Sequence, residues 1–166
     1  MLTRQDLTDE QYVPIRNTPH YVLMAVSAAG GSLFDEIKER RAGLHRIVEG
    51  LKGVHPLVRE IAGADDIVIA EDQLQAWWHG LDDKDRHRGT MRARAMESFN
   101  QALATLRSRG DADDVHHYCV FVLGLARHVA ETAREGDVLG IGGEQVSEGE
   151  RDFIAALEHS ARDAGY

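Results

Sequence analysis

Two groups of acidic and histidine residues have the spacing of metal ligands on helices. His128 and Glu131 are three residues apart, and Glu36 and Glu39 have the same spacing in an earlier segment. Residues three apart lie on one face of a helix, and a bundle can bring two such faces together around one or two metal ions. We therefore take these four residues as candidate ligands of a divalent metal. The usual Glu-x-x-His pair from each of two helices is absent, which favours the alternative that they form polar helix surface.

The sequence contains no motif of a nucleophilic enzyme. No serine, threonine or cysteine stands beside a histidine and an acid in a recognisable pattern. The one cysteine, Cys119, opens an apolar run and is expected to be a small buried hydrophobic residue. The sequence therefore favours a non-enzymatic binding or interaction protein. The alternative is a metal-dependent enzyme or metal-binding protein that uses the four candidate ligands.

A glycine-rich segment from Asp137 to Glu148 has the length of a helix-loop-helix calcium loop. It has acids at its first and twelfth positions and Gly142 at the sixth. Leu139 and Ile141 occupy the third and fifth positions, where their side chains cannot bind a hard cation. The pattern therefore favours a structural loop, held to the helices by its apolar side chains, over a calcium site.

Helical periodicity dominates the segments of the sequence that carry these residues. Apolar residues recur mostly at spacings of three or four, and no segment has a convincing strand pattern. Thr18 followed by Pro19 is typical of a helix start, where a hydroxyl caps the helix and proline takes its first position. We therefore divide the single domain, residues 1–166, into an N-terminal segment, residues 1–17, and a helical bundle, residues 18–166.

The later helices are bounded by capping residues and glycines. They are expected from His55-Pro56 to Gly63, from Glu71 to His79, from Asp82 or Asp83 to Gly110, from Asp111 or Asp113 to Glu135, and from Ser147, with Glu150 completing a capping box, through Ala161. Ile67–Ala70 is too short and isolated to build a sheet and is expected to be a packed connector. The sequence thus predicts an all-α, irregular bundle of five or six helices, with a glycine-rich loop before the last one.

Charge and targeting signals exclude several classes of partner. The net charge is −9, which opposes general phosphate binding, so DNA and RNA are not expected partners. A basic stretch, Lys84–Arg94, lacks aromatic residues that could stack on bases and is expected to be a solvated helix face. The chain has neither a signal-peptide pattern nor an apolar stretch long enough to span a membrane. We expect a cytoplasmic protein.

Apolar residues in the middle of the chain suggest an interface. Trp77, Trp78 and Ile67–Ile69 offer more hydrophobic surface than two short helices can bury alone. Exposed patches of this kind often mark protein contacts, so a protein partner or a homo-oligomer is one interpretation. The other is that both tryptophans cover the single core.

Two segments with a helix-loop-helix pattern, residues 25–39 and 125–157, resemble the tellurite-resistance TerB-like family. In that family an alanine-rich helix runs into an Asp-Gly turn, followed by an acidic residue and a helix opened by serine or proline. Val146, Ser147 and Glu150 match the turn into the second helix, but a longer glycine loop and a glycine pair replace the Asp-Gly turns. The resemblance implies an all-α fold and a bacterial stress-response role through a protein partner or a metal. The missing turns put the family's metal-binding acids in doubt here.

Overall fold

The computed structural model describes residues 1–27, 49, 51–135 and 148–166. No β-strand occurs in these ranges, which confirms the all-α bundle. The glycine-rich loop, Ser147, Glu36 and Glu39 lie outside the described residues. The helices are α1 (Asp9–Ser27), α3 (Pro56–Ile61), α4 (Ala64–His79), α5 (Arg88–Arg109), α6 (Ala112–Glu135) and α7 (Glu148–Asp163), with 3-10 turns at Arg4–Asp6 and Asp83–Asp85.

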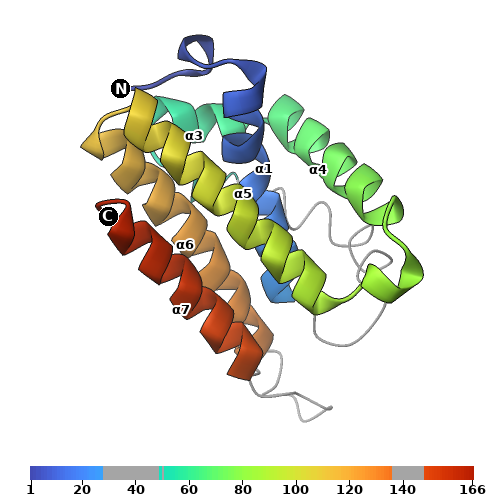
Figure 1. Cartoon of the computed structure of the whole chain (residues 1–166). Helices are drawn as coiled ribbons and strands as arrows, with labels where there is room; N and C mark the ends of the chain where they lie inside the picture. Colours follow the sequence, from blue (N-terminus) through green and yellow to red (C-terminus); the bar gives the residue numbers. More distant parts are fainter. Residues whose placement is uncertain (28–48, 50, 136–147) are drawn as a thin grey trace.

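Helix α1 has the most extensive packing of the helices in the described ranges. It contacts α4, α5 and α6, while α5, α6 and α7 lie side by side in Figure 1. Its side chains Ile15 and Val22 are fully buried, as are Phe99 of α5 and Tyr118 of α6. The core therefore lies between α1 and the layer formed by α5 and α6. None of the helices in the described ranges is both long and apolar enough to cross a membrane.

The expected start of the first helix at Thr18 is wrong, because α1 begins nine residues earlier, at Asp9. A reciprocal pair of hydrogen bonds joins Thr8 and Gln11: the Gln11 N–H donates to Thr8 Oγ1, and the Thr8 N–H donates to Gln11 Oε1. This is a capping box, which satisfies two backbone groups at the helix start. Pro19 lies inside the helix, so residues 1–17 are not a separate segment before the bundle.

The expected connector at Ile67–Ala70 is also wrong, because these residues belong to α4. Ile67 and Ala70 face the core, whereas Val68 and Ile69 are exposed. This is the pattern of one buried helix face, which here overrides the β-branched composition. Trp78 is buried and the ring of Trp77 packs edge-on against Tyr21, so the tryptophans do cover the core.

The start of α5 differs from the expectation, whereas its end agrees. Asp82 and Asp83 precede a 3-10 turn, and the side chain of His87 caps α5 by accepting a hydrogen bond from the Thr90 N–H. Helix α5 ends before Gly110 as expected. Within the basic stretch, Arg94 is partly exposed: its guanidinium lies over the Tyr21 ring and pairs with Glu97.

Candidate metal centre

The site begins with His55, the residue before α3. Pro56 occupies the first position of α3, and a residue before proline is held in an extended conformation, which His55 adopts with φ −67° and ψ 128°. This backbone directs the His55 side chain into the protein, where only 2% of it is exposed. Neither ring nitrogen has a hydrogen-bond partner in the described part of the chain. Such a buried polar group is costly unless something satisfies it.

Two side chains from the start of α6 face this imidazole. Asp113 and His117 are four residues apart and therefore share one face of the helix. The Nδ1 atom of His117 lies 3.0 Å from the main-chain oxygen of Asp113 and 3.3 Å from its Oδ1. His117 is half-buried and Asp113 is exposed. The pair thus forms the solvent side of the site, and His55 forms its buried side.

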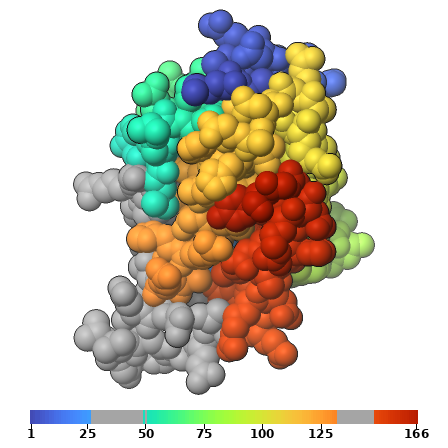
Figure 2. Space-filling view, turned by 90° about the vertical axis from the view of Figure 1, so that its left-hand side faces the viewer, coloured from blue at the N-terminus to red at the C-terminus, as the bar shows by residue number. Residues whose placement is uncertain are grey.

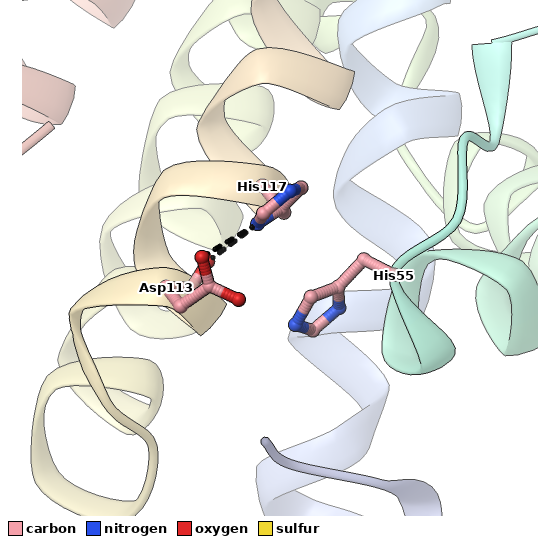
Figure 3. A group of neighbouring side chains, drawn as sticks. All are labelled: His55, Asp113 and His117. Carbon is pink, nitrogen blue, oxygen red and sulfur yellow. Dashed lines mark hydrogen bonds and ion pairs between the residues drawn. The ribbon is translucent and has the colours of Figure 1, made fainter.

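The three side chains converge closely enough to hold a metal ion (Figure 3). One ligand atom from each of His55, Asp113 and His117 lies within 4.8 Å of the others. The two imidazole rings are stacked, with centroids 4.9 Å apart. Zinc bonds of about 2.0–2.2 Å would hold the ligand atoms roughly 3–3.6 Å apart, so binding needs the ligand atoms to move closer by on the order of an ångström. The stacked imidazole rings must also turn so that one nitrogen of each faces the metal.

A second carboxylate, that of Asp114, lies next to His55 in the protein interior. Asp114 is fully buried, and its Oδ1 is 3.0 Å from Nε2 of His55, although the two groups are not aligned for a hydrogen bond. The same oxygen accepts a hydrogen bond from the Leu2 N–H at 2.7 Å. Asp114 therefore places a negative charge beside Nε2 of His55.

A capping box at the start of α6 fixes the backbone at Asp113 and Asp114. The Asp111 side chain accepts hydrogen bonds from the N–H groups of Asp113 and Asp114, and Asp114 accepts one from the Asp111 N–H, each at 2.9 Å. Of the two expected starts of this helix, Asp111 is therefore the cap. Gly110 allows the close approach, because a Cβ atom there would lie 2.9 Å from Oδ2 of Asp114.

Of the four ligands expected from sequence, the structure describes two. His128 and Glu131 both lie on α6 and are exposed. His128 is about 16 Å along the helix axis from His117, so it belongs to a different part of the surface. Glu36 and Glu39 lie outside the described residues.

The three side chains that converge were not predicted as a group from the sequence. His55 was recognised only as part of a helix start, and Asp113 only as a candidate cap. The available signal was Asp113-x-x-x-His117, an acid and a histidine on one helix face. The third ligand comes from the start of α3, which packs on α6 only in the folded chain.

The site lies on the face drawn in Figure 2. The teal segment around α3 borders the gold beginning of α6 there, in agreement with the packing of α3 on α6.

Comparisons of the chain with protein-family models, with curated proteins and with solved structures find no match. The function of the protein is therefore inferred from the geometry of the site.

Proposed function

We propose that this protein binds a divalent transition metal through His55, Asp113 and His117. The observation that carries the proposal is the His55 imidazole, which is buried and has no hydrogen-bond partner in the described residues, yet faces a carboxylate and a second imidazole. A metal ion would satisfy this imidazole. It would also draw the helix start at α3 and the first turns of α6 together.

The ligand set favours some metals over others. Imidazole nitrogen suits zinc, nickel, copper and iron, whereas calcium and magnesium prefer ligand sets made only of oxygen. Two imidazoles and one carboxylate therefore favour a transition metal. The hypothesis that Glu36, Glu39, His128 and Glu131 bind a metal stays a prediction, because Glu36 and Glu39 lie outside the described residues. His55, Asp113 and His117 are supported by their positions.

The TerB-like resemblance would assign the metal-binding function to a bacterial stress response. It rests on residues 25–39 and 125–157, many of which lie outside the described ranges. None of the three proposed ligands lies in either segment. The proposal of metal binding therefore does not depend on the resemblance, and an isothermal titration tests it separately.

Isothermal titration of metal-free protein tests the proposal. We expect zinc, nickel or cobalt to bind with one ion per chain, and calcium and magnesium to bind far more weakly. His55→Ala and His117→Ala should each weaken binding by at least about tenfold, because each removes a ligand.

The exposed pair His159 and Asp163 supplies a matched control. These residues are also four apart on one helix face, and their side chains are in contact, but both are largely exposed. His159→Ala should leave the affinity unchanged. The proposal is wrong if His55→Ala binds zinc as tightly as the unaltered protein, or if His159→Ala causes the larger loss.

A further inference from the structure

We propose that the metal held by His55, Asp113 and His117 keeps a coordination position open to solvent and that a small anion can occupy it. This inference rests on the proposed metal binding. The inference adds that the metal exchanges one of its ligands with the solvent, as in catalytic sites. A structural site, in contrast, takes all of its ligands from the protein.

The number of protein ligands in the described residues is smaller than the number a zinc ion takes. The group that converges in the described residues has three members, whereas zinc takes at least four ligands. Structural zinc sites obtain all four from the protein, while catalytic sites take three from the protein and the fourth from water or substrate. Within the described part of the chain, three ligands therefore leave one position for an external ligand.

The neighbouring side chains are engaged elsewhere. Both oxygens of Asp114 accept main-chain hydrogen bonds, Oδ1 from Leu2 and Oδ2 from Asp111, so this carboxylate is already satisfied. His116, two residues after Asp114 on the same helix, stacks on Tyr166 with ring centroids 5.4 Å apart and meets the His117 ring edge-on with centroids 5.5 Å apart. Neither Asp114 nor His116 belongs to the group of described residues whose ligand atoms converge.

The exposure of the ligands indicates where the open position lies. The side chain of His55 is 2% exposed, that of His117 is 37% exposed and that of Asp113 is 58% exposed. The metal would thus have protein on the His55 side and water on the Asp113 side. Its remaining position would face the solvent, where small molecules can reach it without any opening of the fold.

The charge of the ligand set favours an anion in that position. A divalent cation with one carboxylate and two neutral imidazoles retains one positive charge. Two further carboxylates, those of Asp111 and Asp114, lie nearby, and the Met1 ammonium is 2.9 Å from Asp111 and 3.8 Å from Asp114. This ammonium and the N–H groups of Leu2 and Asp111 offset their negative charge in part. A small anion such as azide can therefore displace a bound water.

Cobalt(II) gives the test a spectroscopic signal. The metal-free protein is loaded with one equivalent of cobalt, its visible absorption bands are recorded, and sodium azide is then added. We expect the bands to shift and the change to saturate at one azide per metal. The same titration of His159→Ala should give the same shift, because that histidine does not belong to the converging group.

The outcomes separate the two proposals. If cobalt binds but its bands do not respond to azide, the centre is closed and this inference is overturned, while metal binding stands. If cobalt gives only the spectrum of the hydrated ion, both proposals fail. If the azide-dependent shift persists in His55→Ala, the responding metal is bound elsewhere, and the inference is overturned as well.

Discussion

Two buried histidines show how strongly the surroundings of an imidazole decide its chemistry. His55 faces two side chains that could share a metal ion with it. His20 on α1 is also buried, but the charge that acts on it is the guanidinium of Arg16. Burial first, and Arg16 second, lower the pKa of His20 to about 4. His20 is therefore neutral in the folded protein at any pH near neutrality.

The depressed pKa of His20 predicts a loss of stability in mild acid. In the unfolded chain this imidazole has a pKa of 6.5, so the unfolded state binds a proton between pH 6.5 and about 4 that the folded state does not. The stability is present in full above pH 6.5 and is lost as the pH falls toward 4. The free energy of unfolding should fall by roughly 3 kcal/mol over this range through this group.

Urea unfolding between pH 4 and 7.5 measures this effect, and comparison with His20→Gln isolates it from other titrating groups. The difference in the free energy of unfolding between the two proteins should depend on pH between 6.5 and 4. His159→Ala, which alters an exposed histidine, should follow the unaltered protein. Parallel pH profiles for His20→Gln and the unaltered protein would contradict the prediction.

At the scale of elements, α1 tolerates a proline in its interior because another helix replaces the missing hydrogen bond. Pro19 has no N–H, so the main-chain oxygen of Ile15, four residues earlier, loses its helical donor. The hydroxyl of Tyr118 on α6 donates to that oxygen at 3.0 Å. Tyr118 is fully buried, and burial raises its pKa. This hydroxyl therefore stays protonated and remains a donor.

A double-mutant cycle tests this compensation. Tyr118→Phe should lower the free energy of unfolding by about 1–3 kcal/mol, because it leaves a buried carbonyl without a donor. In the Pro19→Ala background the new N–H can donate to Ile15, so the same substitution should cost about 1 kcal/mol less. Denaturant unfolding of the four proteins gives these values.

Tyr12→Phe provides the control for that cycle. The Tyr12 hydroxyl donates to Asp66 and does not contact the Ile15 carbonyl, so its cost should be the same in the unaltered and the Pro19→Ala backgrounds. Equal costs of Tyr118→Phe in the two backgrounds would show that Tyr118 does not compensate for the proline.

The same helix shows why part of the fold could not be predicted from sequence. Proline after threonine is typical of a helix start, and the local sequence does not reveal the donor from α6 that replaces the missing hydrogen bond at an interior proline. Thr8-x-x-Gln11 was an available start signal, but it competed with the stronger proline pattern. Helices with regular apolar spacing and clear caps, such as α3 and α6, were predicted well, because their signals are local.

At the scale of the whole molecule, the candidate site joins parts of the chain that are far apart in sequence. His55 precedes α3, whereas Asp113 and His117 belong to α6, and the main-chain N–H of Leu2 reaches Asp114 behind them. Composition and periodicity predict the helical bundle. They do not predict which helix starts meet, and this is why the three ligands could not be assembled from sequence.

Because the site joins separate elements, metal binding should stabilise the folded chain as a whole. A ligand at one hundred times its dissociation constant adds about 2.7 kcal/mol to the free energy of unfolding if the unfolded chain does not bind it. For a chain of this length that corresponds to a rise of roughly 5–10 °C in Tm. Some binding of zinc by histidines of the unfolded chain would reduce the rise.

Thermal unfolding with and without zinc measures this linkage, and hydrogen exchange locates it. Zinc should raise the Tm of the unaltered protein and of His159→Ala, and it should leave the Tm of His55→Ala nearly unchanged. Exchange should slow most at the amides of α3 and of the first turns of α6, because the metal would connect these two elements directly. An equal rise in Tm for His55→Ala would mean that zinc acts at another site, and exchange that slows only in α4 or α7 would identify which part of the bundle contains it.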